Sequence, residues 1–358
     1  MCQYQINISP FGNRWLKMLS FTIAICCYNS ERKIGGTLTA IANCVPPYVQ
    51  ILVVDDGSLD CTREIALDKG IEVVSHGKNL GYGHARQTAF LHTKSDILVF
   101  IDDSCIVNRI WWENLSRLWE EAGPNTQAIA GPMLFSSSRE GLSFFSRSNP
   151  FRPLYLDETQ EFSLLNRLST YFFKRYDWRS GYVRYAANGN LSFRRKALEI
   201  VGGYDPSCNL GGEDEDVCGR VFRKFGKNSI WFDHQLTIDQ TDETTLHSTL
   251  RRSYKYGRVA AWNYKRGGGV PTFLPLPITY FTLVTIVSWL GSFSEAIATF
   301  LLMAYILNFK NRGTSIQGMM MAPFDFLIRI FSETANNIGF ISFTVIGLLH
   351  KYQPKGRR

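Results

Sequence analysis

The sequence lacks the features that mark several common protein classes. Its eight cysteines include no Cys-x-x-Cys spacing, and Cys26 and Cys27 are adjacent inside an apolar run. This pattern argues against a zinc site or a disulfide framework, and we expect reduced, mostly buried thiols in a cytosolic compartment. No isolated Lys/Arg run of the nucleic-acid-binding type occurs, so we expect no nucleic-acid partner. The first twenty residues do not join a basic region to an apolar one, so we expect no secretory signal.

The composition is that of a folded protein with a basic surface. The 358 residues are 45% hydrophobic and 20% charged, which is enough for one large domain or for a domain with an appendage. The formal net charge of +8 suits nucleic acid, anionic lipid or a phosphorylated substrate. The C-terminal basic residues follow apolar segments, which favours lipid. They are Lys351, Lys355, Arg357 and Arg358.

The first hundred residues alternate between short apolar runs and helix-like stretches. The predicted strands are 21–27, 50–54, 71–74 and 97–101. The predicted helices are 31–43, with Ser30 as a possible N-cap, a second helix ending near 69, and 84–92. Buried strands that alternate with helices predict an α/β fold with a mostly parallel sheet.

Polar side chains follow these strands where each one ends. They are Asn29, Asp55, Asp56, Asp102 and Asp103. A single acidic strand end is usually a helix N-cap, but repetition at successive strands favours a ligand site, because ligands collect at the carboxyl edge of such sheets.

A glycine-marked turn precedes Arg86. Gly81 and Gly83 resemble a dinucleotide fingerprint only weakly, because a third glycine is missing. The turn can instead bring Arg86 to a phosphate; the alternative is a solvated arginine on a helix face.

A row of four acids stands at the start of another helix-like run, 213–225. The acids are Glu213, Asp214, Glu215 and Asp216. They suit the positive end of a helix dipole, which alone explains a charged first turn. The other interpretation is that crowding forces their pKa values apart, so that one carboxylate serves as a general base.

Seven motifs between about residues 20 and 235 occur in one order. They are Tyr28-Asn29-Ser30; Val53-Val54-Asp55-Asp56-Gly57-Ser58; Asn79-Leu80-Gly81 with Ala85-Arg86; Phe100-Ile101-Asp102-Asp103-Ser104; Asn188-Gly189-Asn190 with Arg194-Arg195; Gly202-Gly203-Tyr204-Asp205; and Glu213-Asp214-x-Asp216-Val217-x-x-Arg220. Together they resemble glycosyltransferase family 2, the GT-A-fold enzymes that use nucleotide-diphosphate sugars.

The resemblance implies roles for the residues that carry it. Asp55 and Asp56 would hold the nucleobase and ribose, and Asp102 with Asp103 would bind Mn²⁺ or Mg²⁺ on the diphosphate. Asp214 would be the base that deprotonates the acceptor hydroxyl. The further donor-side residues implied are Asn29, Gly57 and Arg86. The further catalytic residues are Glu213, Asp216 and Arg220, and the acceptor-side residues are Asn188, Gly189 and Asn190.

Two positions depart from the family pattern. The metal motif is usually Asp-x-Asp, whereas Ser104 stands at its third position here, so the ion would rest on Asp102 and Asp103 or be held by fewer protein ligands. Gln87 stands where relatives often have Asn, which affects only a local contact. The implied chemistry is an in-line displacement with inversion at the anomeric carbon and no covalent intermediate.

The predicted organisation has four parts: an extension at 1–20, a GT-A domain at 21–240, a basic amphipathic segment at 241–270 and membrane-associated helices at 271–358. The aromatic region 135–184 within the second part either shapes the acceptor site or is an irregular insertion.

The basic segment has three interpretations. It is a membrane-surface helix, a cover over the donor diphosphate through His247 and Arg251, or a solvated helix.

The last part holds two nearly charge-free runs, Phe273–Leu290 and Ala296–Leu307, with basic flanks. They predict a transmembrane hairpin with both ends in the cytoplasm. Phe326–Leu349 is expected to lie in the membrane plane or to form a third span; the alternative for the whole region is a set of core helices.

We therefore expect an inverting transferase at the cytoplasmic face of the cell membrane, acting on a lipid-linked saccharide or a growing polysaccharide. A processive synthase is an alternative, although no Gln-x-x-Arg-Trp motif occurs. A catalytically silent nucleotide-sugar-binding scaffold is another. A nucleotidyltransferase would need a Gly-x-Gly-Thr-Arg loop after the first strand, where Tyr28-Asn29-Ser30-Glu31 stands. The sugar, the nucleotide and the acceptor are not encoded in any spacing rule.

Overall fold

The computed structural model describes most of the chain. The described residues are 19–135, 179–208, 211–241, 245–265, 316–349 and short groups between 279 and 302. Most of the aromatic region 135–184 lies outside them.

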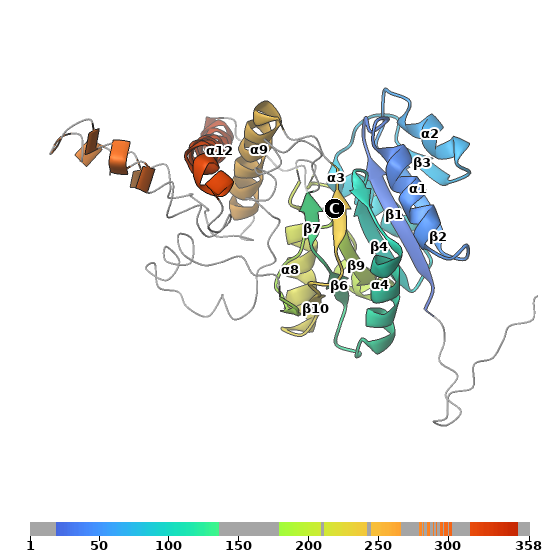
Figure 1. Ribbon diagram of the computed structural model, residues 1–358. Helices are drawn as coiled ribbons and strands as arrows, with labels where there is room; N and C mark the ends of the chain where they lie inside the picture. The colour runs from blue at the N-terminus through green and yellow to red at the C-terminus, as the bar shows by residue number, and fades with distance from the viewer. Residues whose placement is uncertain are drawn as a thin grey trace, which may run out of the picture.

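Two sheets form the scaffold. The larger has the order β3-β2-β1-β4-β9-β6-β10-β8, and the smaller the order β5-β11-β7 (Figure 1). The strands of the larger sheet are β1 (Phe21–Cys27), β2 (Gln50–Asp55), β3 (Glu72–Ser75), β4 (Ile97–Asp102), β6 (Ala128–Ala130), β8 (Gly181–Tyr182), β9 (Asn190–Arg194) and β10 (Ile230–Phe232). Those of the smaller are β5 (Cys105–Ile106), β7 (Met133–Phe135) and β11 (Ile238–Gln240). The pairs β1–β2, β1–β4, β2–β3 and β6–β10 are parallel, whereas β9 runs antiparallel to β4 and β6. The prediction of a mostly parallel α/β sheet is confirmed.

Helices follow the strands as the sequence pattern predicts. They are α1 (Ile34–Cys44), α2 (Thr62–Asp68), α3 (Tyr82–His92), α4 (Arg109–Glu121), α7 (Arg195–Val201), α8 (Glu213–Phe225), α9 (Leu246–Lys265) and α12 (Ile316–Leu349). The first helix starts later than expected. Ser30 lies before a turn at 31–33, and its hydroxyl is used elsewhere, on the Asp103 carboxylate.

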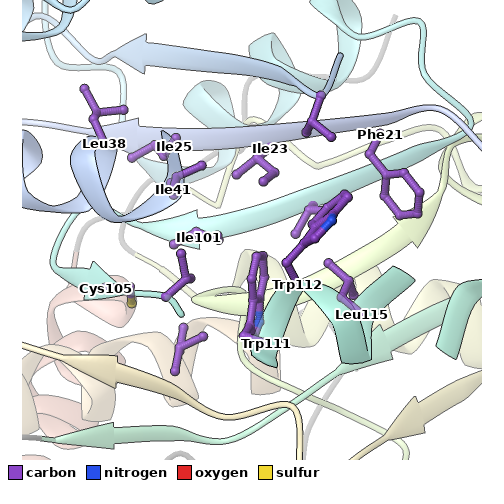
Figure 2. Packing of buried hydrophobic residues seen from close by; sticks show 14 of the residues in the cluster. Phe21, Ile23, Ile25, Leu38, Ile41, Ile101, Cys105, Trp111, Trp112 and Leu115 are labelled. Atoms are coloured by element: carbon purple, nitrogen blue, oxygen red, sulfur yellow. The ribbon is translucent and has the colours of Figure 1, made fainter. Parts of the chain in front are cut away.

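The two-residue period of the strands divides the core between the two faces of the large sheet. Along β1, Ile23 and Ile25 contribute to one cluster and Ala24 to the other. Trp111 and Trp112 of α4 cover the first face together with α1 (Figure 2). On the opposite face the cover comes from α3, α7 and α8. The result is a three-layer domain whose parallel strands all end at one edge.

Two long helices, α9 and α12, pack together beside this domain, and in Figure 1 α9 lies between α12 and the sheets. Their backbones approach closely at two glycines. A Cβ on Gly257 would lie 1.8 Å from the backbone carbonyl oxygen of Asn336. A Cβ on Gly339 would lie 2.1 Å from the backbone carbonyl oxygen of Tyr254. Any side chain at either position would therefore force the helices apart.

The membrane prediction concerns three segments after residue 270. Within the described part of the chain, no helix combines the length and apolar composition needed to cross a bilayer. Most of Phe273–Leu290 and of Ala296–Leu307 lies outside the described residues, so the hairpin stays a prediction. Phe326–Leu349 lies inside α12, and its interpretation as a third span is not supported.

Candidate active site

The site lies at the carboxyl edge of the central strands. Cys27 of β1 is in register with Asp55 of β2, and Cys26 is in register with Asp102 of β4. Because these strands are parallel, their acidic ends meet at one edge. The sequence therefore placed Asp55 and Asp102 correctly relative to each other.

Arg86 joins two of the predicted functional elements. Its Nη2 donates to Asp102 Oδ1 at 2.9 Å, and its Nε donates to Glu213 Oε1 at 3.1 Å. The guanidinium is only 4% exposed and lies 5.1 Å from the centre of the Phe100 ring. Burial opposes its charge, but the two carboxylates help to raise the pKa of Arg86 above its usual range. The alternative of a solvated arginine is wrong; contact with a donor phosphate stays a prediction.

Asn188 and Gly189 lie against the same carboxylates. The Asn188 amide donates to Glu213 Oε1 at 3.3 Å and accepts from the Tyr204 hydroxyl at 2.7 Å. A Cβ on Gly189 would lie 2.7 Å from Asp102 Oδ2. Only glycine leaves this carboxylate its present position.

The acidic row forms the first turn of α8, as predicted. The preceding Gly212 has a φ of 79°, which turns the chain into the helix. Asp214 accepts from the Tyr185 hydroxyl at 3.2 Å and from the Glu215 backbone N–H at 2.8 Å. Burial, with the neighbouring negative charge of Glu213, raises the pKa of Asp214 to about 7. A carboxyl group with this pKa can accept a proton near neutral pH.

Asp216 and Arg220 face a different part of the structure. Arg220 donates to Asp216 Oδ2 at 2.7 Å through Nη2, and its Nη1 donates to the carbonyls of Val201 and Gly203 at 2.6 and 2.7 Å. This pair therefore holds the turn that follows α7 against α8. A direct catalytic part for either residue stays a prediction.

The loop after β2 is fixed to the end of β1. Asn29, whose φ is 52°, donates its N–H to Ser58 Oγ at 2.9 Å, and its side-chain oxygen accepts from the Leu59 N–H at 2.8 Å. Asp55 Oδ1 accepts from the Ser58 N–H at 3.1 Å. Gly57 has a φ of 76° and lies against the Lys78 backbone, where no Cβ would fit. These contacts fix the conformation of the loop after β2, which the sequence predicts to bind the donor.

Asp56 is committed to the neighbouring loop. Its carboxylate accepts the backbone N–H groups of Leu80 and Gly81 at 3.0 and 2.7 Å, and His76 Nδ1 lies 2.6 Å from Oδ1. His76 Nε2 contacts the Thr88 hydroxyl at 2.9 Å. Asp56 thus orders the turn before α3. A contact between Asp56 and the donor ribose stays a prediction, and it would have to coexist with these hydrogen bonds.

The two carboxylates of the predicted metal motif, Asp102 and Asp103, are both partly exposed and have different partners, and binding of a cation by Asp103 stays a prediction. Asp103 Oδ2 accepts from the Ser30 hydroxyl, and Ser104 is buried beside Gln240, whose amide lies 3.4 Å from its hydroxyl. Asp102 is about one-third exposed. Hard cations in nucleotide sites often use one or two carboxylates together with substrate phosphates, so Asp102 fits an ion held mainly by the diphosphate.

A separate group of metal-capable atoms lies outside the predicted motif. Within the part of the chain that the structure describes, the ligand atoms of Asp205, Cys208 and Asp216 lie within 4.8 Å of one another. Asp216 is paired with Arg220, however, and Asp205 accepts from Ser207. The group is accounted for by these contacts within the fold.

Asn190 is not brought to the site. Its side chain accepts from the Trp111 indole at 3.1 Å and donates to the carbonyls of Pro132 and Leu236 at 3.1 and 2.6 Å. The difference follows from the local structure, because Asn188 and Gly189 lie in the turn before β9, whereas Asn190 is the first residue of the strand. Asn190 ties the two sheets together.

Helix α9 borders the site. Lys255 Nζ lies 4.2 Å from the centre of the Tyr82 ring at the start of α3, and Val259 lies within van der Waals distance of a Cβ built on Gly211. Burial lowers the pKa of Lys255, against the attraction of Glu213. His247 and Arg251 are exposed on the first turns of the same helix, and their contact with a donor stays a prediction.

Three residues that contribute to the site were not singled out from the sequence. They are Tyr185, His76 and Lys255. Tyr185 and His76 lie outside the seven family motifs, so no pattern in the sequence indicates that they belong to the site. Lys255 lies in the basic segment, but only the fold shows that it packs against Tyr82.

Comparisons with known proteins identify the family of the chain. The sequence model of "Glycosyl transferase family 2" matches residues 22–202, slightly more than half of the chain. A pre-mycofactocin glycosyltransferase from Mycobacterium tuberculosis is 27% identical over 217 residues, 60% of this chain and 42% of that protein. An inactive polypeptide N-acetylgalactosaminyltransferase-like protein 5 from Macaca fascicularis is 33% identical over 105 residues, 26% of this chain. The chain spans 24% of the latter's length.

Two archaeal proteins extend the likeness. A glucosyl-dolichyl phosphate glucuronosyltransferase from Haloferax volcanii is 23% identical over 225 residues, 60% of this chain and 66% of that protein. A mannosyltransferase from Pyrobaculum calidifontis, solved with GDP-Man and Mn²⁺, superposes with a TM-score of 0.52 at 14% identity over 94% of this chain and 89% of that one. The second likeness supports the GT-A fold. By its matching residues and its fold, the chain belongs to glycosyltransferase family 2.

Proposed function

We propose that the chain transfers a glycosyl group from a nucleotide-diphosphate sugar to an acceptor hydroxyl, with inversion at the anomeric carbon. The observation that carries this proposal is the place of the Asp214 carboxylate, which is held by Tyr185 next to Glu213, the residue that Arg86 bridges to Asp102. Burial and the charge of Glu213 raise the pKa of Asp214 to about 7, in agreement with this role. A base that is half ionised near neutral pH suits deprotonation of a hydroxyl as it attacks.

The proposed reaction is a direct displacement that needs no covalent enzyme intermediate. The acceptor oxygen forms a bond to the anomeric carbon while the bond from that carbon to the diphosphate oxygen breaks. Asp214 takes the acceptor proton, and the nucleotide diphosphate leaves with the electron pair. Tyr185 and the Glu215 N–H hold the Asp214 carboxylate in place, since both donate to it.

Asp102 is the residue that would hold a divalent cation. When bound, Mn²⁺ or Mg²⁺ would act as a Lewis acid that offsets the charge on the departing diphosphate. Arg86 keeps Asp102 Oδ1 oriented by its bond at 2.9 Å. Glu213, through the same guanidinium, couples the position of this carboxylate to the start of α8 and hence to Asp214.

The acceptor we propose is a lipid-linked saccharide or a growing polysaccharide at the cytoplasmic face of the cell membrane. Three observations support this. The basic helix α9 lies beside the site, α12 carries exposed apolar residues, and the Haloferax relative is named for a dolichyl phosphate-linked substrate.

A silent nucleotide-sugar-binding scaffold is the second candidate. It is favoured by the burial of Ser104 at the third position of the metal motif and by the relative that is named inactive. Such a protein would bind a donor without turning it over.

The test is binding and hydrolysis of a panel of nucleotide sugars by detergent-solubilised protein, with and without Mn²⁺ or Mg²⁺. Wild type is compared with Asp214→Asn and with Glu215→Gln, the exposed neighbour on the same turn. We expect one donor to be turned over, with a loss of about 100-fold or more in Asp214→Asn alone, while binding persists. Binding without turnover in every protein would support the scaffold, and no binding at all would refute both functions.

A further inference from the structure

Helix α9 turns one face toward the catalytic domain and the opposite face toward α12. Four residues of the first face lie within about 100° of arc at 3.6 residues per turn. They are Arg252, Lys255, Tyr256 and Val259. Lys255 Nζ lies 4.2 Å from the centre of the Tyr82 ring, and Val259 lies against Gly211. Gly257, on the other side of the helix, contacts the backbone of α12. The face that carries Lys255 is therefore the one that borders the site.

Three cations gather at this face without a carboxylate partner. Burial lowers the pKa of Lys255, Glu213 raises it, and the positive charges of Arg251 and Arg252 lower it further. No ion pair joins any of the three cations to a carboxylate in the part of the chain that the structure describes. Glu213 does not neutralise them, because it is paired with Arg86 at 3.1 Å. Holding like charges together at a partly buried position costs free energy, which favours a binding site for an anion.

Tyr256 shows which part of the site adjoins these cations. Burial raises the pKa of its hydroxyl, the positive charge of Arg252 lowers it, and the negative charge of Asp214 raises it. Asp102, the expected metal ligand, acts on this hydroxyl less strongly than Asp214 does. The cations therefore adjoin the proposed base, where the acceptor hydroxyl must be bound, more closely than the place expected for the donor diphosphate.

We propose that Lys255 and Arg252 bind a phosphate group of the acceptor, so that the acceptor is a saccharide linked through phosphate. A guanidinium binds phosphate oxygens in pairs and an ammonium binds them as a point charge, so the two residue types complement each other. Arg251, which is exposed, adds a third positive charge, and its contact with the donor stays a separate prediction. A bound phosphate would offset the repulsion among the cations and fix the saccharide near Asp214. The inference rests on the proposed function, because it names the class of acceptor for the same site.

The test compares two series of probes that differ only in a phosphate. Decyl glycosyl phosphates of glucose, galactose, mannose and N-acetylglucosamine are compared with decyl glycosides of the same sugars. Their binding to the full chain in neutral detergent is measured by isothermal titration calorimetry, and the binding of UDP and GDP is measured separately. The variants are Lys255→Met and Arg252→Met. Arg258→Met is the matched control, because Arg258 lies on the same helix but 5.9 Å from the centre of the Phe343 ring of α12.

We expect the wild type to bind at least one glycosyl phosphate about tenfold or more tightly than the matching glycoside. Lys255→Met and Arg252→Met should each lose this preference, whereas Arg258→Met should keep it; urea unfolding shows that each variant is folded. Equal affinity of the wild type for the two series, or a preference that either site substitution leaves intact, would overturn the proposal. Weaker binding of UDP or GDP with an unchanged preference would assign the cations to the donor and overturn it as well.

Donor hydrolysis by the same proteins separates this inference from the proposed function. Hydrolysis of a nucleotide sugar by a wild type that shows no preference for phosphate contradicts the acceptor class alone. A preference for phosphate in a protein that neither hydrolyses nor transfers any donor sugar contradicts the proposed function alone.

Discussion

Replacing Arg86 with methionine would leave the carboxylates of Asp102 and Glu213 without their shared cation. The guanidinium is 4% exposed and binds Asp102 at 2.9 Å and Glu213 at 3.1 Å. Removing one partner of a buried ion pair typically costs 3–5 kcal/mol, because the other charge remains without compensation. Asp102 is one-third exposed, so water offsets part of that loss, and we expect Arg86→Met to lower the free energy of unfolding by about 3 kcal/mol.

Urea unfolding followed by tryptophan fluorescence measures this change. The matched control is Arg117→Met, which removes a pair to Glu121 of the same 2.9 Å length on the surface of α4. Exposed pairs at this helical spacing contribute about 0.3–0.5 kcal/mol. The double variant Arg86→Met/Glu213→Gln should recover about 1 kcal/mol or more, since one stranded charge is gone. An Arg86→Met protein as stable as the Arg117→Met control would refute the role of this bridge.

Three further predictions follow from other parts of the structure. Asn190→Ala leaves the Trp111 indole without its acceptor, and we expect a loss of about 2–4 kcal/mol in urea unfolding with donor binding unchanged; lost donor binding in the folded variant would contradict this. Gly257→Leu places a side chain on the Asn336 backbone, and faster amide hydrogen exchange in α9 and α12 should result; wild-type protection would contradict the close packing. Because burial and the charge of Glu213 raise the pKa of Asp214 to about 7, the stability of the wild type falls as the pH rises from about 4, the ordinary carboxyl pKa, to about 7. Asp214→Asn should therefore gain about 1–2 kcal/mol at pH 8 but little below about pH 3, where the wild-type residue is protonated in both the folded and the unfolded state; equal stability at pH 8 would argue against the shift.

The sequence was sufficient for the framework of the fold. β1 was predicted with its observed bounds, because a run of seven apolar or β-branched residues, 21–27, ends at a polar triplet. α8 was predicted from its acidic first turn, and it ends at Phe225, where the sequence predicts an end near Phe225-Gly226. Each of these two signals lies within one short stretch of sequence. It can therefore be read without knowing which residues that stretch packs against in the fold.

Side-chain partners could not be predicted in the same way. Arg86 was expected at a phosphate or in solvent. The fold buries it between carboxylates 16 and 127 residues away in sequence, partners that no local pattern indicates, and contact with a phosphate stays a prediction. Asn190 belongs to the same motif as Asn188 and was assigned to the same site. The fold separates the two because Asn188 lies in the turn before β9 and Asn190 is the first residue of the strand, and the point at which this strand begins is set by its pairing with β4 and β6.

The measurement that tests the central claim most directly is the pH dependence of turnover with the donor identified in the panel. A base must be ionised to act, so the wild-type rate should rise through an apparent pKa near 7 and level off above it. Glu215→Gln should show the same profile, and Asp214→Asn should be slow at every pH. A wild-type rate that stays constant from pH 5 to pH 8, or an Asp214→Asn protein of normal activity, would contradict Asp214 as the base.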